Sequence, residues 1–231
     1  MATATAARDT TRALARPLLA EALGTGLLVA TVVGSGIMSQ QLAPGQVLLQ
    51  LLCNALATVA VLGLLIALLG PVSGAHINPA VTLVDAVAGR LRVPVAAGYI
   101  LAQISGGCAG TLLVHAMFGQ QLVQWTGQVR TGGGLWLGEV VATAGLLVVI
   151  RLLSDGRAHL IAIGVPAWIF AAYFFTSSTS FANPAVTVGR ALTGSFAGIA
   201  PASVPAFLLA QLVGAAIGVG IARLLRTGGE R

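Results

Sequence analysis

The pentapeptide Asn-Pro-Ala-Val-Thr occurs twice in the chain, at residues 78–82 and again at residues 183–187. Each copy begins a short apolar segment, 78–89 in the first half and 183–193 in the second. Asn is a strong helix N-cap, and Pro is tolerated in the first helical turn because its missing N–H has no partner there. At 1.5 Å per residue, such a helix would be about 16–18 Å long, roughly half a bilayer core. The repeat therefore predicts two half-length helices.

Six longer apolar segments surround these two, and each can cross a hydrocarbon core of about 30 Å as a helix. They are residues 17–39, 46–69, 94–117, 135–154, 158–177 and 201–225. Only 8% of the 231 residues are charged, 57% are hydrophobic, and the mean hydropathy is +0.94. A soluble domain has about 25% charged residues, so we expect an all-α protein in the lipid bilayer, with six transmembrane helices and two re-entrant half-helices.

Polar landmarks follow the same order in both halves of the chain. Glu21 lies in the first span of the first half, and Glu139 lies at the matching place in the second. Gln103 and Gln211 lie in the last span of each half, and each is followed by Gly at the third and seventh positions after it. This agreement indicates an internal duplication.

The duplication predicts one membrane channel domain, residues 1–231, built from repeat 1 (about 17–117) and repeat 2 (about 135–225). Each repeat has three full spans, so the second enters the membrane from the opposite side. The fold is then an inverted 3+3 repeat, with its two half-helices entering from opposite faces.

The net charge of +6 and the pI of about 11.0 do not indicate nucleic-acid binding, because every basic residue is Arg and most flank apolar segments. Only Arg130 and Arg190 fall on one side of the predicted membrane. The other side has Arg8, Arg12, Arg16, Arg90, Arg92, Arg151, Arg157, Arg223, Arg226 and Arg231. The positive-inside rule then predicts a multi-pass membrane protein with both termini cytoplasmic.

The half-helix N-termini are expected to meet near the membrane midplane. Each carries roughly +0.5 charge from the helix dipole, so a cation or proton there is repelled and a neutral solute is not. Side-chain N–H groups of the two asparagines can face the lumen and orient a passing oxygen atom. The predicted pore midpoint comprises Asn78, Pro79, Ala80, Asn183, Pro184 and Ala185.

The strings SGAHINPAVT and FANPAVT, together with the paired Glu and Gln residues, resemble the aquaporin or major intrinsic protein family. The resemblance covers nearly the whole chain. It implies an hourglass of six spans with one pore per subunit, assembled as a homotetramer. It also implies that His76, just before the first motif, is a structural residue of the pore wall.

Glu21 and Glu139 are carboxylates inside predicted membrane spans, where such residues are costly. Two interpretations remain open. In one, they form a proton relay in a secondary transporter. In the other, each accepts hydrogen bonds from N–H groups of the re-entrant loops and braces them, which is the role that the family resemblance favours.

The family has a second, outer constriction built from four positions. These are usually an aromatic residue on span two, often a His on span five, a residue just before the second Asn, and an Arg directly after the second Asn-Pro-Ala. Matched spacing places the four filter positions of this chain at Thr58, Ala171, Ser180 and Val186. All four are small and none is charged. The counts to Thr58 and Ala171 can each be off by a residue or a turn, and Tyr173, Phe174 or Phe175 could reach into the filter.

A filter without Arg loses the hydrogen-bond donors of the guanidinium group and one electrostatic barrier to cations, and it becomes wider. Water, glycerol-like polyols and undissociated metalloid acids such as arsenite then become plausible cargo. Arg190 either supplies a charge from the outer end of the second half-helix or is a vestibule or interfacial residue. FANPAVT with such a filter resembles a bacterial subgroup of aquaglyceroporins associated with arsenic resistance. This resemblance implies a location in a bacterial-type inner (plasma) membrane.

These patterns favour a passive channel for small, mostly neutral solutes. We find no catalytic constellation, phosphate-binding loop or metal-ligand cluster in the sequence, and expect neither enzymatic activity nor a cofactor. The alternatives are a water-selective aquaporin with an unusual filter and a proton-coupled transporter that uses Glu21 or Glu139. A membrane protein with a purely structural role would show no flux at all.

Overall fold

All regular elements among the described residues of the computed structural model, 2–125 and 127–226, are helices. Side chains are described from Leu14 onward, so those of Arg8 and Arg12, and the whole of Arg231, lie outside the described residues. The elements are α1 (Ala2–Leu42), α2 (Val47–Ser73), α3 (Pro79–Val87), α4 (Val93–Met117), α5 (Gly133–Ser154), η1 (Ala158–Leu160), α6 (Ile161–Phe175), α7 (Pro184–Arg190), η2 (Pro201–Ser203) and α8 (Val204–Leu225).

Six helical segments of the described residues are long and apolar enough to cross a membrane, which confirms the predicted six-span all-α fold. The spans differ from the prediction mainly at their ends. Helix α1 continues through Pro17 toward the N-terminus, and α2 continues past Pro71 to a left-handed cap at Gly74. A proline interrupts one helical hydrogen bond but does not end a helix whose neighbouring groups are otherwise satisfied.

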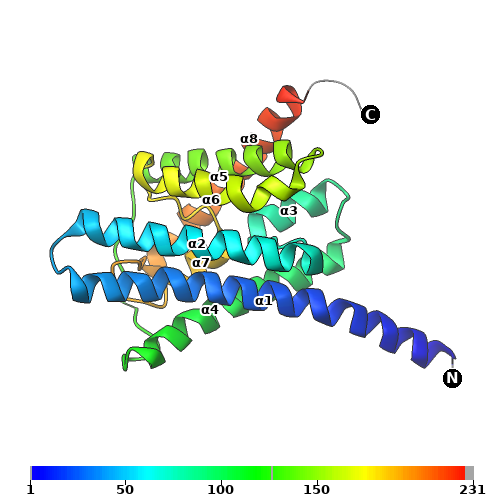
Figure 1. Ribbon diagram of the computed structural model, residues 1–231, viewed down its shortest axis with the longest axis horizontal. Coiled ribbons are helices and arrows are strands. Elements are labelled where there is room, and N and C mark those ends of the chain that lie inside the picture. Colours follow the sequence, from blue (N-terminus) through cyan, green and yellow to red (C-terminus); the bar gives the residue numbers. More distant parts are fainter. Residues whose placement is uncertain (1, 126, 227–231) are drawn as a thin grey trace.

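The two halves of the chain pack in the same way. Helix α1 lies against α2 and α4, and α5 lies against α6 and α8, while α2 and α6 contact one another across the halves (Figure 1). The half-helix α7 is almost wholly buried, whereas α3 is buried over its first turn, 79–82, and exposed at Leu83 and Val87. Each of them contacts the last span of the opposite repeat, α3 with α8 and α7 with α4. The half-helices therefore join the two repeats.

The Gly residues that follow Gln103 in α4 and Gln211 in α8 explain why these spans cross α1 and α5 so closely. A Cβ added to Gly106 would lie 2.1 Å from Ala22 O, and one added to Gly110 would lie 2.2 Å from Gly26 O. The second repeat has the matching contacts, at 2.5 Å for Gly214 with Val140 O and 2.3 Å for Gly218 with Ala144 O. Only Gly allows backbones to approach so closely, as is common between membrane helices.

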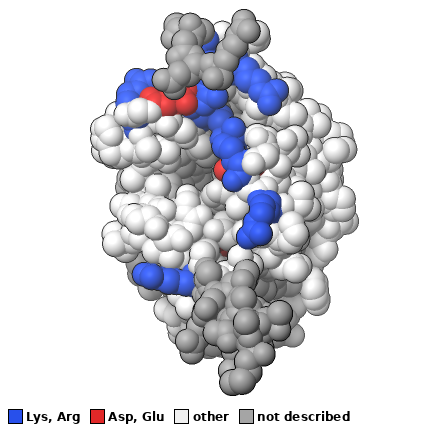
Figure 2. Space-filling view, turned by 90° about the vertical axis from the view of Figure 1, so that its right-hand side faces the viewer, with Lys and Arg blue, Asp and Glu red and all other residues white. Residues whose placement is uncertain are grey.

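The first residues of α1 and the last residues of α8 lie at the same end of the molecule, at the right in Figure 1. Figure 2 looks onto this end and shows arginine side chains spread over it, with few acidic ones. Exposed arginines of the elements that end here are Arg16, Arg90, Arg92, Arg157, Arg223 and Arg226. We refer to this as the inner end and to the opposite one as the outer end.

Candidate functional site

Each Asn-Pro motif begins a half-helix, as predicted. Asn78 Oδ1 accepts a hydrogen bond from Ala80 N (2.9 Å) and caps α3. Asn183 Oδ1 accepts from Ala185 N (3.0 Å) and Val186 N (3.3 Å) and caps α7. Pro occupies the first helical position in both cases, where no N–H partner is lost.

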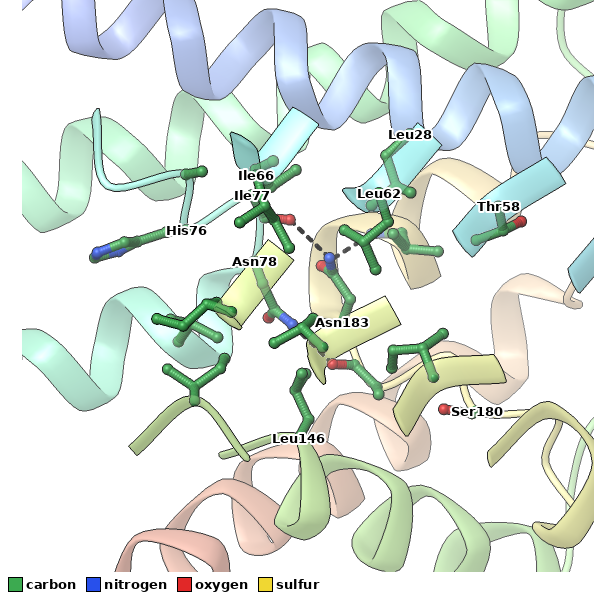
Figure 3. Close-up of a pocket in the computed structure, with 18 of the residues that line it drawn as sticks. Leu28, Thr58, Leu62, Ile66, His76, Ile77, Asn78, Leu146, Ser180 and Asn183 are labelled. Carbon is green, nitrogen blue, oxygen red and sulfur yellow. Dashed lines mark hydrogen bonds between the residues drawn. The ribbon is translucent and has the colours of Figure 1, made fainter. Parts of the chain in front are cut away.

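The two asparagine side chains also tie the motifs to each other. Asn78 Nδ2 donates to Ala182 O (2.8 Å), and Asn183 Nδ2 donates to Ile77 O (2.7 Å), as Figure 3 shows for the latter. These crossed bonds hold the helix N-termini face to face. Each amide has two N–H groups and one is used here, so the other can serve a passing oxygen atom.

In repeat 1, Glu21 holds the backbone that leads into the motif. Its carboxylate accepts hydrogen bonds from His76 N (3.0 Å) and Ile77 N (2.7 Å). Gln103 Nε2 donates to Glu21 Oε2 (2.7 Å) and is also within 2.9 Å of Thr82 Oγ1 on α3. The carboxylate thus links α1, α4 and the re-entrant loop.

In repeat 2, Glu139 makes the same set of contacts. It accepts from Phe181 N (2.8 Å) and Ala182 N (2.9 Å). Gln211 Nε2 donates to Glu139 Oε2 (2.6 Å) and contacts Thr187 Oγ1 (2.8 Å). The duplication read from the sequence therefore extends to individual hydrogen bonds.

These contacts hold backbone that is otherwise unfavourable. Ala75 and Ile77 have φ of 47° and 48°, and Ser180 and Ala182, at the matching places, have φ of 52° and 49°. Residues other than Gly rarely adopt this left-handed conformation, and such strain persists only where its surroundings enforce it. The bracing interpretation of the two glutamates agrees with these bonds.

A cavity of about 300 Å³ passes between the two motifs. In Figure 3, Asn78 and Asn183 lie in its middle, His76 lies toward one end, and Thr58 and Ser180 lie toward the other. Both glutamates are 0% exposed and are not among its lining residues, so the geometry gives no support to a proton relay through the lumen. Helix α6 lines the cavity with every fourth residue, namely Ile161, Val165, Ile169 and Tyr173.

Three of the four predicted filter positions, Thr58, Ser180 and Val186, line the cavity. Ala171 does not, because it lies on the exposed face of α6. Tyr173, one of the alternatives considered above, takes this place, and its hydroxyl lies 3.3 Å from Thr58 Oγ1. The spacing of four residues along α6 is the sequence signal that would have selected Tyr173.

At the inner end, Asp85 on α3 is surrounded by three basic side chains. His76 Nε2 lies 3.2 Å from Asp85 Oδ2, and Arg90 Nε lies 2.9 Å from Oδ1. Arg151 on α5 also donates to Oδ1 and is 7% exposed. Asp85, His76 and Arg151 all line the cavity. Nothing in the sequence placed Arg151, which belongs to another span, at the Asp85 carboxylate.

Six apolar spans, two half-helices that meet tip to tip and a cavity that passes between them define a membrane channel. The family model described as major intrinsic protein matches residues 9–158. An aquaglyceroporin, AqpS, of Rhizobium meliloti (strain 1021) is 49% identical over 92% of this chain and 91% of its own. Aquaporin-6 of Mus musculus is 30% identical over 80% of this chain and 65% of its own.

The chain belongs to the major intrinsic protein family, and it is a channel for small solutes and not an enzyme. Its fold matches the solved structure of the aquaglyceroporin from Plasmodium falciparum with a TM-score of 0.68. That match covers 91% of this chain and 95% of the other at 19% sequence identity. The family resemblance and the fold read from the sequence are thereby confirmed.

Proposed function

We propose that the protein is an aquaglyceroporin-type channel that lets water, glycerol-like polyols and undissociated metalloid acids such as arsenite equilibrate across a bacterial inner membrane. The observation that carries the proposal is the filter, where Val186 lines the cavity at the position directly after the second Asn-Pro-Ala. A valine there leaves the passage without the arginine that usually narrows it. The 49% identity to a protein named as an aquaglyceroporin supports the same cargo class.

The side chains of the filter are not all small, as the sequence had indicated they would be. Thr58, Ser180 and Val186 are small, but Tyr173 adds a ring whose hydroxyl lies beside Thr58. The lining of this part of the cavity therefore combines an apolar side chain with hydroxyl groups. Such a surface suits solutes that have a carbon or metalloid skeleton and several hydroxyl groups. Its apolar part can pack against the skeleton, and its hydroxyl groups can form hydrogen bonds with those of the solute.

The proposal includes a homotetramer in the lipid bilayer, with one pore per subunit and both termini cytoplasmic. Exposed arginines at the inner end support the orientation through the positive-inside rule. The tetramer follows from family membership alone. Multi-angle light scattering of detergent-solubilised protein, corrected for detergent, would show four chains of 23.2 kDa, and a monomer would contradict it.

Stopped-flow measurements on proteoliposomes test the cargo. Water, glycerol and arsenite should each cross faster than through empty liposomes, and only down their gradients. An imposed pH gradient should not change the flux of a neutral solute. Uphill accumulation would instead identify a coupled transporter, and water flux without glycerol flux would identify a water-selective aquaporin.

A further inference from the structure

Arg190 is the last residue of α7, seven residues after Asn183, and Asp85 is seven residues after Asn78. The two residues are therefore equivalent in the duplicated motif. Each contacts the residue two before its own asparagine. Asp85 lies 3.2 Å from His76, and the Arg190 guanidinium carbon lies 3.4 Å from the centroid of the Phe181 ring. The duplication thus places a charged side chain at both ends of the cavity.

The two charges differ in how they are balanced. Asp85 is paired with three basic side chains, whereas Arg190 forms no salt bridge within residues 14–125 and 127–226. Within the same residues, its guanidinium makes a single hydrogen bond, from Nε to Ala197 O. A buried cation without a carboxylate partner is costly, and stacking on an aromatic ring offsets only part of this cost. Arg190 is 2% exposed and lines the cavity.

Helix geometry directs the Arg190 guanidinium back toward the filter residues. Helical side chains point back toward the N-terminus, so a residue one turn beyond Val186 covers the surface beside Val186. The stacking partner Phe181 is the residue next to Ser180, which lines the filter. Ser180 Oγ is buried and has no hydrogen-bond partner among the described residues. Ser180 and Arg190 both line the cavity, so the fold brings an unpartnered hydroxyl and a guanidinium to the same lumen.

We infer that Arg190 is the cation of this channel's filter and takes over the function of the arginine that is absent at residue 186. This inference rests on the proposed channel function and adds a selectivity determinant to it. The charge repels cations at the outer entrance before they reach the midplane. The free N–H groups, together with Ser180 Oγ, serve the oxygen atoms of polyhydroxylated solutes. Because the side chain is stacked on Phe181, the passage beside Val186 stays open.

Arg130 provides a matched control. Its guanidinium carbon is 5.1 Å from the same Phe181 ring, and Arg130 Nε donates to Gly198 O, but it is not among the residues that line the cavity. Replacing either arginine by glutamine removes one positive charge near Phe181. Only the Arg190 change removes it from the lumen.

The test compares wild type, Arg190→Gln, Arg190→Lys and Arg130→Gln in proteoliposomes. The leak of sodium ions is measured with an entrapped dye and divided by the water flux. For Arg190→Gln we expect this ratio to rise about tenfold, since one unit charge a few Å away raises the barrier to a cation enough to change its flux by about that factor. Arg190→Lys keeps the charge and should remain near wild type, as should Arg130→Gln. A wild-type ratio in monodisperse Arg190→Gln would overturn the inference.

Normalising to water separates this outcome from a failure of the proposed cargo, which would appear as absent glycerol flux in the wild type. Arg190→Gln leaves a shorter amide side chain buried beside Phe181, where an unpaired N–H is costly, so this variant can misfold, whereas a valine at this position brings no polar group. In that event the double variant Val186→Arg/Arg190→Val moves the charge inward by one turn. It should retain the wild-type sodium ratio and lower glycerol flux about tenfold, because the arginine now narrows the passage. Wild-type glycerol flux, or a sodium leak above wild type, would count against the inference.

Discussion

At the scale of single residues, the filter is set by which side chains reach one layer of the cavity. Val186 provides an apolar wall on α7, while Ser180 and Tyr173 provide hydroxyl groups from the loop and from α6. Selectivity in such passages follows from width, from lining donors and from charge. Changing one side chain at a time should therefore separate these three contributions.

Val186→Arg should lower glycerol and arsenite flux about tenfold and water flux much less. The added side chain fills the passage at the filter layer and adds donors that water can still satisfy. Stopped-flow light scattering on proteoliposomes measures the ratio of the fluxes. Val186→Leu is the control, since it adds bulk without charge and should reduce glycerol flux only modestly. An unchanged glycerol-to-water ratio in Val186→Arg would show that residue 186 does not limit passage.

Residues counted from the motifs line the cavity where rigid structure connects them to the motif. Val186 lies within α7 and Ser180 lies in the strained loop directly before Asn183, so their positions follow from the motif itself. Ala171 does not line the cavity, because the count backward from Asn183 crosses residues 176–182, whose irregular backbone does not preserve helical register. Side-chain periodicity within α6, which selects Tyr173, is the more reliable guide there.

At the scale of elements, the two buried glutamates maintain the left-handed loops that place the half-helices. Glu139→Gln replaces one acceptor oxygen by an NH₂ group that faces donors, either Phe181 N or Ala182 N. A buried N–H left without a partner costs about 1–3 kcal/mol, so this variant should unfold at a lower temperature. Thermal unfolding in detergent, followed by fluorescence-detected size exclusion, measures the change.

Glu21→Gln should lose a similar amount of stability, since its contacts match those of Glu139. Asp155→Asn is the control, because Asp155 is exposed and pairs only with Arg226 within the described part of the chain. Solute flux through either glutamine variant should remain independent of an imposed pH gradient. A gradient-driven flux in the wild type that vanishes in these variants would instead support the proton relay.

Two glycines of α8 give a second test at this scale. Gly218→Ala would place a Cβ 2.3 Å from Ala144 O on α5, so the spans must separate, at a cost of about 1–3 kcal/mol. Gly220 is two residues further along the same helix, and a Cβ added there would have no described atom outside its own helix turn within 4 Å. Gly220→Ala should therefore be neutral or slightly stabilising. Equal unfolding temperatures for the two variants would show that this crossing tolerates a methyl group.

At the scale of the whole molecule, composition and the internal repeat were enough to predict the class and the number of spans. The contacts between repeats were less accessible to sequence reasoning. Arg151 of α5 reaches Asp85 of α3, and α7 packs on α4, yet neither pairing has a local signature. These contacts depend on how the inverted repeats interlock, which is a property of the assembled fold.

The arginine distribution makes one further prediction about the whole molecule, which is its orientation. If the inner end faces the cytoplasm, residue 121 of the loop after α4 faces outward, and residue 159 in η1, between α5 and α6, faces inward. Gln121→Cys and His159→Cys, both at exposed positions, can be introduced after replacing Cys53 and Cys108 by Ser. In intact cells a membrane-impermeant maleimide should label only Gln121→Cys, and His159→Cys should react only after permeabilisation. The reverse labelling pattern would mean that the arginine-rich end faces outward and that loop charge does not determine the topology of this chain.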